Sequence, residues 1–205
     1  MKYKLVCFDM DGIVFKNENF WAELYKAFGG KKKFEYNKKE AYLKIAAEVA
    51  RFCKGKDYGR YGDFVKKIGY NPGAKEVFSA IKRRGMKTAL ISSGPIELAE
   101  RAQEDFSVDF VYTNRLVTEE KSFSISGELW MPVRFDNKDR ILESVCTQMG
   151  IGREETISVG HDEDDINLAM VSGLAIAFNP KSKGLEKACK HTVNGSLKGI
   201  LKHLK

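Results

Sequence analysis

The sequence lacks the features that would place the protein in a membrane or in a cysteine-rich class. No apolar run approaches the roughly 20 residues of a membrane-spanning helix, and a strand-like segment begins within the first five residues. We therefore expect a cytoplasmic protein without an export signal or a membrane partner. The cysteines are few, far apart and form no Cys-x-x-Cys pair, which disfavours a zinc site and predicts reduced, mostly buried thiols. They are Cys7, Cys53, Cys146 and Cys189.

Concentrated positive charge is also scarce, although the formal net charge is +7. The basic residues are dispersed, and the short run from Lys31 to Lys33 is typical of a solvated loop. Because no nucleic-acid-binding motif accompanies it, we expect no nucleic-acid partner. A positive field also favours a small phosphorylated substrate, so charge alone does not separate these two classes. The sequence does not indicate an oligomeric state.

What the sequence does contain is an alternation of strand-like and helix-like segments. With 205 residues, 43% of them hydrophobic, the chain can bury one sizeable core and carry a small second domain. The alternation, with polar residues after successive strands, predicts an α/β fold with a Rossmann-like, doubly wound, mostly parallel sheet. The expected strands are 5–8, 87–92, 108–112, 156–160 and 174–178, with a last one near 192–193.

Three amphipathic segments, 18–28, 41–52 and 58–68, interrupt the connection between the first two expected strands. We therefore expect residues 16–70 to form a helical cap that shields the end of the first strand. Residues 1–15 and 71–205 would then form the core domain. The alternative is that these helices simply pack on the core. A hairpin with arms at 114–117 and 123–129 is expected to extend from the sheet.

Two aspartates directly follow the first expected strand. In an open parallel sheet the carboxyl ends of the strands border the ligand crevice, so Asp9 and Asp11 should open into it. Gly12 allows the sharp turn. A calcium loop has a similar start, but it would need a preceding helix and a Glu at its end. Because a strand precedes the aspartates here, that interpretation fails.

Polar groups suited to an anion follow the second expected strand. The hydroxyl of Ser92 and the amides of Ser93 and Gly94 precede a helix that Pro95 is expected to start, which indicates a phosphate cradle. Ordinary helix capping remains an alternative. Lys138 stands at a later helix start, where a cation is unfavourable unless an anion offsets it. An exposed lysine is the alternative there.

The loop after the fourth strand, 161–165, contains four acidic residues and a histidine. Acidic groups this close repel one another unless a cation lies among them, so the loop indicates a divalent ion. One or two of them, most naturally Asp164 or Asp165, could instead serve as helix caps.

Together these motifs resemble those of the haloacid dehalogenase-like (HAD) phosphatases, and among them the phosphoserine phosphatase-like branch. The likeness covers nearly the whole chain and rests on motif order and spacing. The motifs are Asp9 to Gly12, Ser92, Lys138 and the acidic loop after Gly160, with support from Asn114 to Leu116 and from Ala177 to Lys181. The resemblance implies a metal-dependent phosphomonoester hydrolase that forms an aspartyl-phosphate on a small phosphorylated substrate.

The resemblance also implies individual roles. Asp9 would be the nucleophile and Asp11 the general acid/base. Ser92, with the Ser93 and Gly94 amides, would hold phosphoryl oxygens together with Lys138, which also offsets charge near Asp9. The reaction centre would therefore consist of Asp9, Asp11, Ser92, Ser93, Gly94 and Lys138.

Magnesium would bind Asp9, the carbonyl of Asp11 and a carboxylate of the acidic loop. Here the sequence departs from the family pattern, because His161 stands where its metal-binding Asp is expected. Three outcomes follow: Asp162 or Asp165 completes the site, with Asp162 preferred; a softer ion such as Mn²⁺ is favoured; or catalysis is impaired. The last outcome leaves a phosphate- or anion-binding protein.

The substrate is expected to be phosphoserine, with another small phosphomonoester as the alternative. Glu18 matches the cap glutamate that meets the substrate's amino group in the resembled branch, although an acid at a helix start is also ordinary. A cap arginine for the substrate's carboxylate has no secure counterpart, and Arg51 and Arg60 are candidates.

Overall fold

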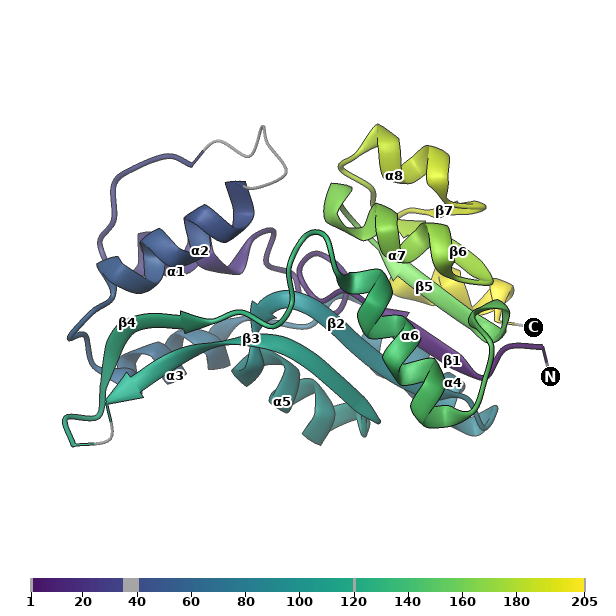
Figure 1. The fold of residues 1–205 in the computed structure, drawn as a ribbon, viewed down its shortest axis with the longest axis horizontal. Helices are drawn as coiled ribbons and strands as arrows, with labels where there is room; N and C mark the ends of the chain where they lie inside the picture. The colour runs from purple at the N-terminus through teal and green to yellow at the C-terminus, as the bar shows by residue number, and fades with distance from the viewer. Residues whose placement is uncertain (1, 35–40, 120, 205) are drawn as a thin grey trace.

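The computed structural model describes residues 2–34, 41–119 and 121–204 of the chain. Residues 35–40 of the expected cap and residue 120 of the expected hairpin turn lie outside the described residues. The helices and strands, in chain order, are β1 (Leu5–Phe8), α1 (Phe20–Ala27), α2 (Ala41–Phe52), α3 (Tyr58–Lys67), α4 (Ala74–Arg83), β2 (Lys87–Pro95), α5 (Ile96–Phe106), β3 (Phe110–Glu119), β4 (Ser124–Trp130), α6 (Lys138–Met149), β5 (Thr156–Gly160), α7 (Ile166–Val171), β6 (Leu174–Phe178), α8 (Lys183–Ala188) and β7 (His191–Val193), with short 3₁₀ turns at Arg153–Glu155, Glu163–Asp165 and Leu197–His203 (Figure 1).

One sheet organises the described chain, with strand order β4-β3-β2-β1-β5-β6-β7. All neighbours run parallel except β3 and β4, which confirms the predicted α/β class. The chain leaves β1 toward β2 on one side and later returns to β5 on the other. A crevice opens at such a switch point, beyond the carboxyl ends of the strands. The sheet order therefore predicts a ligand site directly after β1.

Every residue of β1 is buried because helices cover both faces of the sheet. Leu5 and Cys7 share an apolar cluster with Leu142 of α6, whereas Phe8 packs with Phe78 of α4 on the opposite face. Figure 1 shows the two layers, with α6 and α7 on one side of the sheet and α4 and α5 on the other. The continuous apolar run in the sequence follows from this double burial. None of the described helices is both long and apolar enough to cross a bilayer.

Helices α1, α2 and α3 lie beside the β3–β4 end of the sheet (Figure 1). Aromatic rings hold them together: Phe20 contacts Trp21 edge-on, and also Tyr61 and Phe64 from α3. Their buried residues join the same apolar cluster as the inner side chains of α4 and α5. Asn71, just after α3, ties the loop after β1 in place by donating to the carbonyls of residues 12, 13 and 15.

The predicted strand 108–112 and the first predicted hairpin arm, 114–117, are one continuous strand, so the division between them was wrong. The polar pair Thr113 and Asn114 lies where the prediction divided the strand, and both residues are buried. The Asn114 amide donates to the carbonyls of Ser93 and Val133. This buried polar side chain is therefore hydrogen-bonded, and the strand continues through it. The hairpin itself is confirmed by the antiparallel pairing of β3 with β4. Pro95 ends β2 and precedes α5 rather than starting it.

Candidate active site

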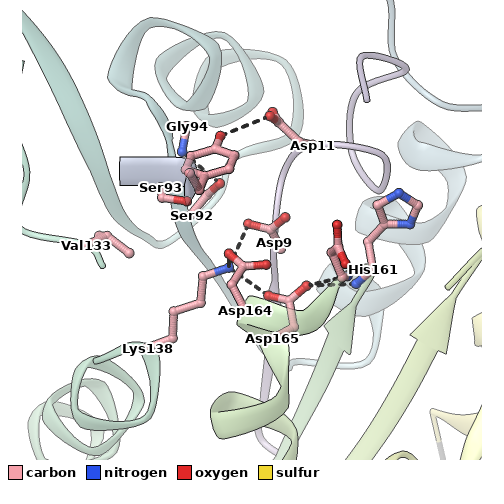
Figure 2. A network of polar contacts seen from close by, with 12 residues as sticks. Asp9, Asp11, Ser92, Ser93, Gly94, Val133, Lys138, His161, Asp164 and Asp165 are labelled. Atoms are coloured by element: carbon pink, nitrogen blue, oxygen red, sulfur yellow. Dashed lines mark hydrogen bonds and ion pairs between the residues drawn. The ribbon is translucent and has the colours of Figure 1, made fainter. Parts of the chain in front are cut away.

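The polar residues singled out in the sequence meet at the carboxyl ends of β1, β2 and β5. Asp9 follows β1, Ser92 lies near the end of β2, and Asp164 and Asp165 follow β5. Lys138, the first residue of α6, projects into the same space (Figure 2). Parallel strands deliver their ends to one edge, so residues up to 156 positions apart in sequence, from Asp9 to Asp165, become neighbours.

A completely buried lysine is the centre of this cluster. The ammonium of Lys138 lies 3.2 Å from Asp9 Oδ1, 2.7 Å from Asp164 Oδ2 and 2.7 Å from Asp165 Oδ1. These carboxylates offset the positive charge that the amino terminus of α6 would otherwise disfavour. Burial lowers the pKa of Lys138, but the three carboxylates raise it by more, so the side chain stays charged.

The cluster has more negative than positive charge. With all groups ionised, three carboxylates face one ammonium, which leaves a net charge of −2 in a buried space. Burial raises the pKa of Asp9 to about 6, and the neighbouring Asp164 and Asp11 add to the rise that Lys138 opposes. Burial likewise raises the pKa of Asp165 to about 7. The site is therefore short of positive charge when it holds protein groups alone.

Asp165 also holds the acidic loop in shape. Its Oδ2 accepts from the amides of His161, at 2.7 Å, and Asp162, at 3.3 Å, while Oδ1 accepts from Lys138. Both oxygens are thus used within the protein, and the residue is 1% exposed. Asp165 is the residue that links the loop after β5 to α6.

Asp11 lies apart from Lys138 (Figure 2) and is bound by a separate set of donors. Asn17 donates to Oδ1 at 2.7 Å, and Oδ2 accepts from the amide of Phe20 at 2.8 Å and from the hydroxyl of Tyr42 at 3.3 Å. Burial raises the pKa of Asp11 to about 6, although these hydrogen bonds lower it. A carboxyl with such a pKa can both give and take a proton near neutral pH.

The segment from Ser92 to Gly94 lies opposite the two aspartates. The Ser92 hydroxyl accepts from the Gly94 amide at 3.1 Å, and it lies near enough to Asp9 to oppose the rise in pKa that burial causes there. The carbonyl of Ser93 accepts from Asn114 and from the indole of Trp21 at 3.1 Å, which fixes the loop from both sides. A Cβ at Gly94 would come within 2.9 Å of the terminal methyl of Met10, so that side chain would have to shift to admit one.

His161 and Asp162 lie differently from the acidic residues beside Lys138. The imidazole Nδ1 of His161 lies 3.0 Å from the carbonyl of Phe178, and Nε2 is buried without a hydrogen-bond partner among the described residues. The ring packs on Gly12, where a Cβ would lie 2.5 Å from it. Asp162 is exposed, and its carboxylate accepts from the amide of Glu163. Asp164 and Asp165, not Asp162, are the loop carboxylates that meet Asp9 at Lys138.

The donor set suits a hard cation only in part. Within residues 2–34, 41–119 and 121–204, no three His, Cys, Asp or Glu side chains are arranged to hold a metal ion. However, Asp9 and Asp164 both contact the same ammonium, and the excess negative charge around it matches a divalent cation. Carboxylate oxygens are the ligands that Mg²⁺ prefers, whereas an imidazole is a poor one. A magnesium ion therefore fits these two carboxylates and not His161.

Glu18, the candidate substrate ligand, pairs with Lys181 from the loop after β6. The hydrogen bond from Lys181 lowers the pKa of the glutamate, which stays ionised. Of the two arginine candidates, Arg60 donates to the carbonyl of Ala27 at 3.0 Å and lies over the ring of Phe28, and Arg51 is exposed. The described structure brings neither arginine into the cluster.

Three residues of the site were not identified from the sequence. Asp164 was considered as a helix cap, and its contact with Lys138 depends on how the loop folds. Asn17 and Tyr42 belong to none of the sequence motifs that predicted the site. Asn17 lies in the polar segment directly after the first motif, which is a usable signal; no sequence pattern distinguishes Tyr42.

Comparison with protein-family models matches residues 3–170 to the haloacid dehalogenase-like hydrolases. The chain belongs to this family. Its likeness to HAD phosphoserine phosphatases extends over the whole chain. It is 28% identical over 211 residues to a phosphoserine phosphatase of Methanocaldococcus jannaschii, an alignment that covers 100% of this chain and 99% of the relative.

Solved structures of the HAD family agree with this. A substrate-bound phosphoserine phosphatase complex superposes with a TM-score of 0.89 at 25% identity, over 100% of both chains. A phospho-aspartyl intermediate analogue of phosphoserine phosphatase gives the same TM-score at 26% identity, again over 100% of both chains. The fold and the family expected from the sequence are therefore confirmed.

Proposed function

We propose that this protein is a metal-dependent phosphomonoester hydrolase that acts through an aspartyl-phosphate and uses phosphoserine as its substrate. The observation that carries the proposal is the separation of the two motif aspartates. Asp9 lies against Lys138, whereas Asp11 is bound by Asn17, Phe20 and Tyr42. An anionic nucleophile and a proton donor need such different surroundings.

In the first step an oxygen of Asp9 bonds to phosphorus as the P–O ester bond breaks. The leaving oxygen keeps the electron pair of that bond and takes the proton of Asp11. In the second step ionised Asp11 takes a proton from water, whose oxygen attacks phosphorus. Inorganic phosphate leaves and the carboxylate of Asp9 is restored. The pKa of Asp11, about 6, supports both roles.

The phosphoryl group is held by Ser92, by the amides of Ser93 and Gly94, and by Lys138. The Ser92 hydroxyl lies near enough to Asp9 to lower the carboxyl pKa that burial raises, which supports a position beside the nucleophile. Fixed donors that face the phosphoryl oxygens stabilise the charge that develops in the transition state. Residues 16–70 act as a cap domain on the core formed by 1–15 and 71–205, and they exclude water from this step.

Asp9 and Asp164 are the residues that would hold Mg²⁺, with the carbonyl of Asp11 as the third ligand that the resemblance implies. When bound, the ion supplies the positive charge that Lys138 alone does not provide, and it neutralises phosphoryl oxygens. The two carboxylates provide the oxygen ligands. Mn²⁺ is the alternative ion because it tolerates nitrogen ligands such as His161.

Substitution of Asp164 tests this ligand assignment. Asp164→Asn is expected to weaken Mg²⁺ binding at least about tenfold, because one of two carboxylate charges is lost. Titration calorimetry on the metal-free protein measures the affinity directly, with Mn²⁺ in a parallel titration. Asp162→Asn is the matched control, since its carboxylate bonds the Glu163 amide, and its affinity should stay within about twofold of wild type. If Asp162→Asn weakened Mg²⁺ binding and Asp164→Asn did not, Asp162 would be the metal ligand instead.

The substrate assignment is tested by phosphate release from O-phosphoserine, phosphoethanolamine and glycerol phosphate. Glu18 supports a substrate with an amino group, and Lys181 beside it offers a cation for a carboxylate. We expect the highest kcat/KM with phosphoserine, which carries both groups. Release from the other esters but not from phosphoserine would reject the substrate and keep the hydrolase. Release from none of them with Mg²⁺ or Mn²⁺ would reject the enzyme.

A further inference from the structure

Tyr42 connects a helix of the cap domain to the general acid/base. It lies in the first turn of α2, whose inner face buries Ile45, Ala46 and Val49 among apolar neighbours. The hydroxyl at the tip of its ring lies 3.3 Å from Asp11 Oδ2. The contact joins two residues 31 positions apart in sequence. Asp11 therefore has a partner outside its own loop.

The same side chain also lies near the phosphate-binding segment. Burial raises the pKa of Tyr42, and the nearby Ser93 side chain opposes this rise. Tyr42 of α2 is thus bonded to the loop after β1, through Asp11, and lies close to the end of β2. A side chain in this place can fix the direction of the Asp11 carboxyl relative to the phosphoryl site.

Tyr42 serves as a hydrogen-bond donor rather than as a charge. Burial, followed by the negative charges of Asp11, Asp9 and Asp164, raises its pKa well above the ordinary value, so the phenol stays protonated. Asn17 and the Phe20 amide hold Asp11 from the chain segment that directly follows it. Tyr42 is the donor that comes from α2, and its contribution requires α2 to be seated on the core.

We propose that Tyr42 is a positioning residue for Asp11, which it orients from the cap domain so that the carboxyl proton points at the leaving oxygen. The inference rests on the proposed hydrolase function. If Tyr42 has this role, proton transfer from Asp11 depends on how α2 packs on the core, whereas attack by Asp9 does not need the phenol. Misplacing a catalytic group by about 1 Å lowers the rate of the step in which that group takes part.

The test compares two esters that differ in their need for an acid. The alkyl oxygen of phosphoserine must be protonated to leave, whereas p-nitrophenolate leaves unprotonated. With Tyr42→Phe, the single-turnover rate of serine release from phosphoserine is expected to fall at least about tenfold, and that of p-nitrophenol release from p-nitrophenyl phosphate to stay within about twofold, because leaving-group release reports the first step before Asp11 acts on water. The ester concentration that gives the half-maximal single-turnover rate should change by less than about twofold for both esters, because the phosphate-holding groups remain. Tyr25→Phe is the matched control, since its ring packs on Phe34 and Phe52 within the cap domain.

A second measurement separates positioning from a general disturbance. In an Asp11→Asn background, adding Tyr42→Phe should change the remaining activity by less than about twofold, since the group that it orients is gone. Equal losses in the first-step rate on both esters, or the same tenfold loss in the Asp11→Asn background, would overturn the inference, as would an unchanged first-step rate of Tyr42→Phe on phosphoserine. If wild type hydrolysed neither ester, the proposed function would fail first, and that result is distinct from an unaffected variant.

Discussion

Asp9→Asn is expected to abolish phosphate release and at the same time to stabilise the metal-free fold at neutral pH. Without its nucleophile the enzyme should lose at least about 10⁴-fold in kcat. Stability should rise because burial raises the pKa of Asp9 to about 6, so the folded protein carries an unfavourable buried charge at pH 7.5. Asn removes that charge, and Lys138 keeps Asp164 and Asp165 as partners.

The pH dependence of this stabilisation follows from the same pKa. Between its ordinary value of 3.8 and about 6, folded Asp9 binds more protons than the unfolded chain, so wild-type stability is lost as pH rises through that range. Asn has no such dependence. The gain in Tm from Asp9→Asn should be on the order of 5 °C at pH 7.5 and should vanish below about pH 4.

Thermal unfolding in a chelating buffer, followed by circular dichroism, measures the gain in Tm. Asp63→Asn on the exposed face of α3 is the control and should change neither Tm nor kcat. A lower Tm for Asp9→Asn at neutral pH would show that the ionised carboxylate stabilises the metal-free cluster. Retained turnover would remove Asp9 as the nucleophile.

Lys138→Met is expected to destabilise the fold more than any other single change in the cluster. It leaves three carboxylates in a space where the lysine itself is 0% exposed. Removing one partner of a buried ion pair costs about 3–5 kcal/mol, which corresponds to a fall in Tm of roughly 10 °C for a chain of this size. Activity should fall as well, since a cation that faces the phosphoryl group is lost.

The double variant Lys138→Met with Asp164→Asn shows whether unpaired charge is the cause. Because Asp164 directly contacts Lys138, neutralising it should return part of the lost stability. Lys4→Met provides the control: that lysine pairs with Glu155 with half of its side chain exposed, and its loss should cost less than about 1 kcal/mol. If the two changes were simply additive, like-charge repulsion would not explain the effect.

Local pattern was sufficient to predict most of the fold. The four-residue apolar run of β1 is buried on both faces, and α2 spans the residues that its periodicity indicated. Helix α6 begins at Lys138 as predicted. The error at β3 has a physical cause: a buried Asn114 that bonds two carbonyls looks, in sequence, like the polar residue of a turn.

The sequence alone determined the family, the order of the strands and helices along the chain, and the motifs that would lie at one edge of the sheet. Hydrophobic periodicity and motif spacing are local properties of the sequence, so they can be recognised without knowing which segments pack together in the fold. Only the tertiary structure decided that Asp164 rather than Asp162 faces Asp9, that Glu18 pairs with Lys181, and that Tyr42 reaches Asp11. These contacts depend on side-chain directions and on segments packed from distant parts of the chain, which no spacing in the sequence records.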